Sequence, residues 1–176
     1  MESLDFAQFL DALQFAAQRH RDQRRKGPAH APYVNHLIEV AALLYQVGEV
    51  RDGTVLTAGL LHDVIEDTLT TPEEIRRRFG ADVLSLVLEV TDDKSLLPAE
   101  RKRLQVQHAP HLSPGAHMIK LADKICNVHD ILQDPPPDWS ERRCQDYLAW
   151  ARQVVAGCRG VNPALEAAFD ALYQEE

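Results

Sequence analysis

The chain has 176 residues, of which 45% are hydrophobic, and a formal net charge of −8. This length predicts one domain spanning residues 1–176 with a substantial core, and the hydrophobic fraction excludes a disordered chain. The negative charge argues against nucleic acid as a partner, and charges interrupt every apolar run, so we expect no membrane-spanning segment.

Three helices are predicted in the first part of the chain. Residues 4–21 and the segment from His36 to Gly48 place apolar residues at the three-and-four spacing of an amphipathic helix. Between them, residues 24–32 lack this periodicity and contain Gly27 and two prolines, which predicts a loop rich in positive charge. The third helix is predicted from Thr54 to Asp67.

The rest of the chain predicts six more helices. Thr71-Pro72 and Ser113-Pro114 each place a capping side chain before a proline in the first helical position. The expected helices are 71–80, 81–90, 98–108, one that starts at residue 113 and ends before the prolines at 135–137, 140–157 and 163–174. No segment shows the period-two alternation of a sheet of any size, so the predicted fold is all-α, a globular bundle of eight or nine helices.

The third helix carries an unusual concentration of polar groups, with one histidine and three carboxylates within residues 62–67. On a continuous α-helix, residues four apart share a face, so His62 would stack with Glu66 and Asp63 with Asp67. Unpaired titratable groups beside an apolar face are costly to bury, and a metal or a reacting substrate would offset that cost. The pattern therefore predicts a functional site on this helix.

Two distant residues extend the candidate site. His36 and Asp123, taken with His62 and Asp63, supply two imidazoles and two carboxylates from three predicted helices. This set suits a borderline divalent ion such as manganese, iron or zinc. Ordinary explanations stay open, because His36 is also typical of a helix end and Asp123, between two lysines, of a surface ion pair. The hypothesis of a metal site depends on the three helices converging.

The order of His36, His62-Asp63 and Asp123 resembles the pattern of HD-domain metal phosphohydrolases. Longer stretches are similar to the hydrolase domain of RelA/SpoT proteins, especially to the single-domain form found in metazoa and bacteria, the small alarmone hydrolases. The similar stretches are 17–26, 32–36, 60–68, 91–94, 101–105 and 120–127, and the resemblance covers almost the whole chain. It implies an HD-type helical domain.

The resemblance also implies an activity, namely manganese-dependent hydrolysis of the 3′-pyrophosphate of (p)ppGpp to GDP or GTP and pyrophosphate. It implies one Mn²⁺ per chain, with four ligands: His36, His62, Asp63 and Asp123. It assigns activation of the attacking water and proton transfer to Glu66 and Asp67. Contacts with the nucleotide substrate would come from Arg25, Lys26 and Asn127.

The chain departs from the family pattern at Cys126, Val128 and His129, where Tyr or His, Leu or Met, and Arg are expected. We interpret Cys126 as a small buried hydrophobe rather than a ligand. His129 leaves the contacts with base and phosphate open. Two substrate alternatives therefore stay open, an adenine alarmone such as (p)ppApp and NADPH. A catalytically silent nucleotide-binding HD module is the alternative from a different class.

Cysteine usage bears on the compartment. The three cysteines are odd in number and show no CxxC spacing, which indicates free thiols in a reducing cytoplasm. The acidic first residues lead directly into a helical pattern, so no signal peptide is expected. The expected partner is a nucleotide, and the sequence is compatible with a homo-oligomer.

Overall fold

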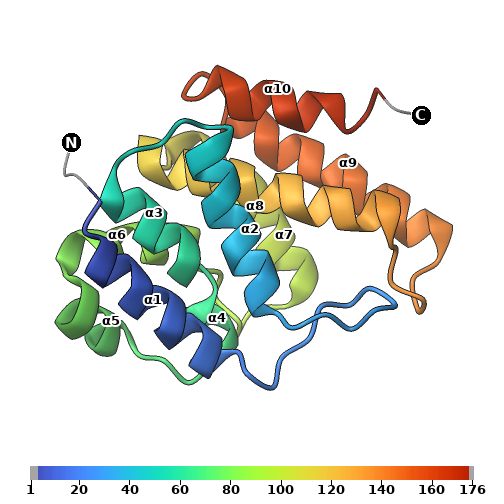
Figure 1. Ribbon diagram of the computed structural model, residues 1–176. Coiled ribbons are helices and arrows are strands. Elements are labelled where there is room, and N and C mark those ends of the chain that lie inside the picture. The colour runs from blue at the N-terminus through green and yellow to red at the C-terminus, as the bar shows by residue number, and fades with distance from the viewer. Residues whose placement is uncertain (1–3, 175–176) are drawn as a thin grey trace.

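Ten α-helices and one short 3-10 helix make up the regular structure of residues 4–174, the part of the chain that the computed structural model describes (Figure 1). They are α1 (Phe6–Arg19), α2 (Val34–Gln46), α3 (Gly53–Leu61), α4 (Val64–Asp67), α5 (Pro72–Phe79), α6 (Ala81–Val90), α7 (Pro98–His108), η1 (Ala109–His111), α8 (Pro114–Gln133), α9 (Glu141–Gly157) and α10 (Pro163–Ala171). Within these residues there is no β-strand, and an isolated bridge between Arg24 and Pro32 closes the loop that follows α1. The all-α prediction is confirmed.

Side-chain caps begin several helices at the predicted positions. Oγ1 of Thr71 accepts a hydrogen bond of 3.2 Å from the backbone N–H of Glu74, and Oγ of Ser113 accepts one of 3.4 Å from that of Ala116. Both caps are followed by the proline that the sequence places first in the helix. The Glu74 side chain pairs with Arg19 on α1, so it ties α5 to a neighbouring helix.

The predicted continuous helix from Thr54 to Asp67 is wrong. The chain leaves helical geometry at its most polar point, because α3 ends at Leu61 and α4 begins at Val64. Asp63 has φ −103° and ψ −3°, a conformation outside a regular helix turn. Because of this break, the described residues form ten α-helices where eight or nine were expected. On an unbroken helix the neighbouring side chains of His62 and Asp63 would diverge by about 100°; the break allows them to face each other.

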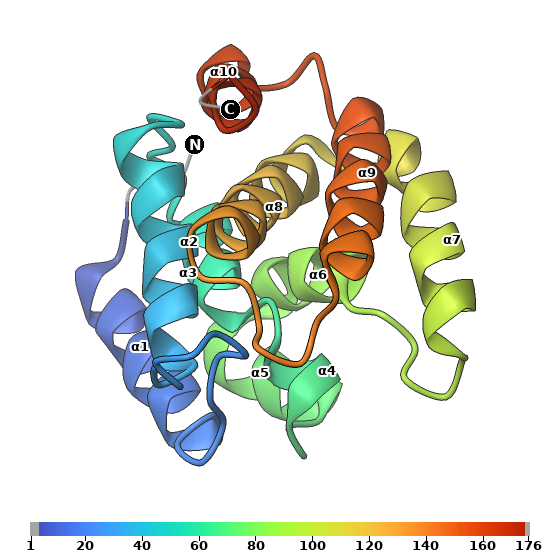
Figure 2. The ribbon, with the colours of Figure 1, turned by 90° about the vertical axis from the view of Figure 1, so that its right-hand side faces the viewer.

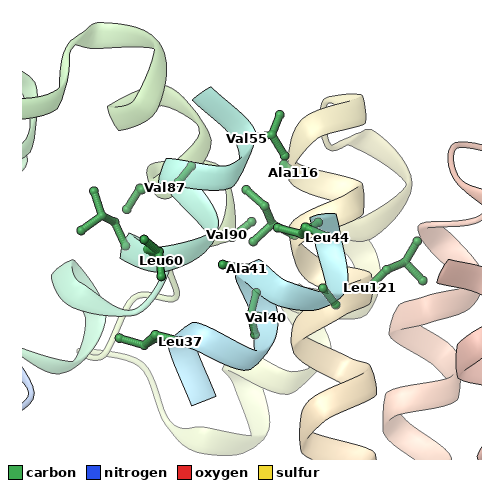
Figure 3. Close-up of a cluster of buried hydrophobic side chains, with 14 of the residues drawn as sticks. Leu37, Val40, Ala41, Leu44, Val55, Leu60, Val87, Val90, Ala116 and Leu121 are labelled. Carbon is green, nitrogen blue, oxygen red and sulfur yellow. The ribbon is translucent and has the colours of Figure 1, made fainter. Parts of the chain in front are cut away.

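The core lies where α2, α3, α6 and α8 meet. Eight of the nine residues of α3 are buried and the ninth, Thr54, is partly buried, so this helix has no fully solvent-exposed side. Figure 3 shows apolar side chains from these helices packed together, among them Leu37, Leu60, Val87 and Leu121. Burying each such side chain contributes roughly 1.5–3 kcal/mol. The parts of α2, α3 and α8 that carry the candidate site are thus fixed to one rigid core.

The longest helix, α8, runs through the middle of the molecule. Figure 2 shows it between α2 on one side and α9 on the other, and both pack against it. It buries polar side chains as well as apolar ones: His117, Lys120, Asp123 and Lys124 all lie in its buried set. Among the described helices none is both long and apolar enough to cross a membrane.

Candidate active site

The four predicted metal ligands converge from three directions. His36 lies on α2, His62 and Asp63 occupy the break between α3 and α4, and Asp123 lies on α8. Nε2 of His36 is 3.3 Å from Oδ1 of Asp123, and Nε2 of His62 is 3.0 Å from Oδ2 of Asp63. The cross distances are similar, at 3.8 Å from His36 to Asp63 and 3.7 Å from His62 to Asp123. The helices therefore do meet, as the metal-site hypothesis requires.

The two imidazoles are arranged as ligands rather than as core polar groups. Both are buried, yet Nε2 of His36 and Nε2 of His62 have no hydrogen-bond partner. Nδ1 of His62 lies 2.8 Å from the carbonyl oxygen of Gly59, which accepts its proton and leaves the lone pair on Nε2. Buried polar atoms without a partner are rare. With Asp123 these nitrogens form a group whose ligand atoms lie within 4.8 Å of one another, which fits a divalent cation.

The electrostatics of the cluster favour a positive charge at its centre. Burial alone would lower the pKa of His62, but the carboxylates of Asp63 and Asp123 outweigh it and raise this pKa to about 10. Burial would raise the pKa of Asp123, but the Lys124 ammonium at 2.9 Å and the two imidazoles hold it well below its usual range. Both carboxylates thus stay ionised, and a proton or a metal cation supplies the balancing charge.

Tyr33 is a member of the site that sequence reasoning missed. Its hydroxyl donates a hydrogen bond of 2.5 Å to Oδ2 of Asp63, and its ring contacts that of His36 edge to face at 5.5 Å. Burial, followed by the charge of Asp63, raises the pKa of Tyr33 well above its ordinary value, so the phenol stays a donor. An aromatic residue in a loop carries no periodic signal, and only its position three residues before His36 could have singled it out.

Glu66 and Asp67 lie on α4 beside the cluster, at the wall of the cleft. Oε2 of Glu66 accepts a hydrogen bond of 3.0 Å from the backbone N–H of Asp92, while Oε1 faces Lys94 at 3.5 Å and Arg101 at 3.6 Å. Burial raises the pKa of Glu66, with smaller contributions from other carboxylates. A carboxylate with a raised pKa is suited to accept a proton near neutral pH.

Both carboxylate oxygens of Asp67 accept hydrogen bonds from side chains. Its Oδ2 accepts a hydrogen bond of 2.8 Å from Nε2 of Gln23, and its Oδ1 accepts one from the Lys94 ammonium. These contacts join α4 to the loop after α1 and to the segment after α6. Glu66 and Asp67 therefore share one cationic partner, Lys94.

A cleft of about 360 Å³ opens over the cluster. His62, Asp63 and Asp123 lie at it, as do the predicted substrate residues Arg25, Lys26 and Asn127. Cationic side chains surround it from several elements: Arg25, Lys26, Lys94, Arg101, Lys120 and Lys124. Although the whole chain is acidic, this cleft is therefore suited to a ligand with several negative charges.

The predicted substrate residues Arg25 and Asn127 are bonded to each other. Nη2 of Arg25 donates to Oδ1 of Asn127 at 3.0 Å, and Nε donates to Asp130 at 3.0 Å. Nδ2 of Asn127 in turn donates to Oδ1 of Asp123 at 2.5 Å. The guanidinium also lies 5.7 Å from the ring centre of Tyr33. One hydrogen-bonded chain thus joins the basic loop to the metal-binding cluster.

Lys26 and His129 differ in their relation to the cleft. The Lys26 ammonium lies 5.8 Å from the ring centre of Trp139, at the cleft wall. The side chain of His129 is 59% exposed, lies outside the cleft lining and has its Nδ1 3.9 Å from Oδ1 of Asp130. Cys126 is buried, as predicted.

Comparison with known proteins identifies relatives along nearly the whole chain. The HD domain family matches residues 12–146. A guanosine-3′,5′-bis(diphosphate) 3′-pyrophosphohydrolase from Xenopus tropicalis is 50% identical over 174 residues, which cover 99% of this chain and 97% of that protein. The enzyme of the same name from Homo sapiens is 53% identical over 169 residues, 96% of this chain and 94% of its own length.

A solved structure shares the fold. It is described as a metazoan ortholog of SpoT that hydrolyses ppGpp and plays a role in starvation responses. The two structures superpose with a TM-score of 0.95 at 45% identity, covering 99% of this chain and 98% of that one. These findings confirm the resemblance drawn from the sequence: the chain belongs to the HD domain family.

Proposed function

We propose that the chain is a manganese-dependent hydrolase that removes the 3′-pyrophosphate of (p)ppGpp. The observation that carries this proposal is the largely buried cluster of His36, His62, Asp63 and Asp123 beside a cleft that several Lys and Arg side chains line. The cluster fits a divalent ion, and the cleft fits a polyphosphate. The relatives named as 3′-pyrophosphohydrolases, at 50% and 53% identity, support the same substrate.

The proposed reaction divides its tasks among the residues of the site. A divalent ion at the cluster would make water a better nucleophile and offset charge on the phosphoryl group. Glu66 accepts the proton of the attacking water, because its raised pKa keeps it a useful base near neutral pH. Asp67 assists this proton transfer and also keeps Lys94 in place through its hydrogen bond, while Lys94 and Arg101 face the charge that develops on the pyrophosphate.

Recognition of the nucleotide is assigned to the other side of the cleft. Arg25 presents a flat guanidinium that is already oriented by Asp130 and Asn127, so little side-chain entropy is lost when a base stacks on it. Lys26 adds charge beside the Trp139 ring. These groups read ring shape and phosphate charge, and a guanine nucleotide fits both.

The test compares substrates on purified protein with Mn²⁺ present. We expect ppGpp to be converted to GDP and pyrophosphate with a higher kcat/KM than ppApp or NADPH. The products are separated by anion-exchange chromatography, and His62→Ala serves as the inactive control. If ppGpp were not turned over while NADPH was, the substrate assignment would be overturned. Binding without turnover of any of the three would identify a silent nucleotide-binding module.

A further inference from the structure

A second group of metal-ligand atoms lies behind the first. One ring nitrogen of His36, a carboxylate oxygen of Glu39 and Sγ of Cys126 all lie within 4.8 Å of one another. Neither Glu39 nor Cys126 has a role in the hydrolytic reaction described above. Cys126 is a free, buried thiol.

The helix geometry explains why the two groups are adjacent. His36 and Glu39 are three residues apart on α2, and Asp123 and Cys126 are three residues apart on α8. Residues at this spacing lie one above the other on the same helix face. Because α2 and α8 pack together, the turn that carries Glu39 meets the turn that carries Cys126, one level beyond the turn with His36 and Asp123.

His36 belongs to both groups of ligand atoms. Its Nε2 faces Asp63 and Asp123, while its Nδ1 is buried and has no hydrogen-bond partner. The side chain is only 1% exposed. Asn35, His36 and Glu39 also border a hollow of about 130 Å³. Glu39 is exposed, so solvent reaches one side of this group.

We propose that His36, Glu39 and Cys126 form a second cation site that takes a thiophilic divalent ion such as Zn²⁺. Imidazole, carboxylate and thiolate are the common zinc ligands, and a water molecule from the exposed side completes a tetrahedron. Thiolate selects zinc or cobalt over manganese, which prefers oxygen and nitrogen ligands. Binding replaces the thiol proton of Cys126 with the S–metal bond and releases that proton to solvent.

Because they share His36, the two sites compete. A neutral imidazole has one lone pair and one N–H. An ion bound through Nδ1 moves the ring proton to Nε2, which then no longer offers a lone pair to the first site. Occupation of the second site therefore weakens cation binding at the first. This inference concerns cation binding alone, and it holds whichever nucleotide the cleft accepts.

Cobalt spectroscopy tests the site without any activity measurement. Co²⁺ is titrated into the whole purified chain with Mn²⁺ present, and the thiolate-to-cobalt charge-transfer absorption is recorded. The proposal predicts this absorption in the unaltered protein and in Cys144→Ser, the control at a cysteine outside the group. It predicts loss of the band in Cys126→Ser and a weakened apparent cobalt affinity in Glu39→Gln, whose substitution lies at the surface.

Competition is measured in the same titration. The electron paramagnetic resonance signal of free Mn²⁺ should increase as the cobalt band grows, and the increase should be larger than in Cys126→Ser, where Co²⁺ displaces Mn²⁺ only by binding at the first site itself. No charge-transfer band in the unaltered protein, or an equal band in Cys126→Ser, would overturn the site. A band in the unaltered protein that forms with no release of Mn²⁺ would overturn the sharing of His36.

Discussion

The hydroxyl of Tyr33 donates a 2.5 Å hydrogen bond to Oδ2 of Asp63, thirty residues further along the chain. The same ring stacks on His20 at 5.1 Å and contacts His36 at 5.5 Å. Tyr33 therefore controls the orientation of one carboxylate and one imidazole of the candidate metal site. It does so from the loop that also carries Arg25, so the cluster and the basic loop have a common support.

Replacing Tyr33 with Phe should weaken cation binding while leaving the fold intact. The substitution keeps the ring and removes the hydrogen bond that orients Asp63, and loss of such a supporting bond costs roughly 10–100-fold in metal affinity. Isothermal titration with Mn²⁺ measures the change. Tyr45→Phe is the matched control, because Tyr45 is exposed and contacts Arg51 away from the cleft. An equal affinity in both variants would show that Asp63 needs no such support.

Four alanine substitutions should distinguish the residues that bind the cation from the residues that act in the reaction. His62→Ala and Asp63→Ala should lose both bound metal and turnover, because each removes a group at the centre of the cluster. Glu66→Ala and Asp67→Ala should keep the metal and lower kcat by roughly 10²–10⁴-fold, the usual contribution of a general base. Elemental analysis after dialysis gives the metal content. Equal metal loss in all four variants would make the assigned roles wrong.

The acid limb of the activity profile should depend on Lys94. Burial raises the pKa of Glu66 above its ordinary 4.5, and the Lys94 ammonium at 3.5 Å opposes that rise. Glu66 must be deprotonated to accept a proton, so activity should fall as the pH drops through its raised pKa. Lys94→Met removes the opposing charge, which should raise the pKa further and move the acid limb of kcat to higher pH.

The control for this profile is Arg103→Met, since Arg103 pairs with Glu100 on the exposed side of α7. Its acid limb should match that of the unaltered protein. If Lys94→Met lowered kcat at every pH without moving the limb, Lys94 would act on the substrate alone.

Gly59 should resist substitution because of a close approach between α2 and α3. A Cβ at this position would lie 2.7 Å from Cδ1 of Leu44, which is fully buried. Overpacking of this kind costs about 1–3 kcal/mol, and better helix propensity returns roughly 1 kcal/mol. Gly59→Ala should therefore lower the urea midpoint, with a net loss of about 1 kcal/mol. Because the Gly59 carbonyl orients His62, Mn²⁺ affinity should fall as well. A midpoint at or above that of the unaltered protein would contradict this.

Local signals predicted most of the fold. Caps and prolines act within one helical turn, so Thr71-Pro72 and Ser113-Pro114 mark helix starts that the structure confirms. The break between Leu61 and Val64 had no such signal, because Leu60, Leu61, Val64 and Ile65 continue an apolar pattern that a helix accepts. Tertiary contacts interrupt the helix there, because His62 and Asp63 converge on groups from α2 and α8.

The site was predictable to a similar degree. The order of its histidines and acids identified the cluster residues, and the structure brings those residues together. The contacts that orient them could not be predicted, because they join residues far apart in sequence. Arg25 meets Asp130 across 105 residues, and Gln23 meets Asp67 across 44. No spacing rule describes pairs that only the packed helices bring together.

The amide of Asn127 makes cation and nucleotide binding thermodynamically linked. Its Nδ2 donates a hydrogen bond to Asp123 in the cluster, and its Oδ1 accepts one from Arg25 in the loop. A nucleotide that repositions Arg25 changes the hydrogen bonding of a carboxylate that holds the cation. By reciprocity, the factor by which nucleotide changes Mn²⁺ affinity equals the factor by which Mn²⁺ changes nucleotide affinity. Asn127→Ala should bring both factors towards unity together.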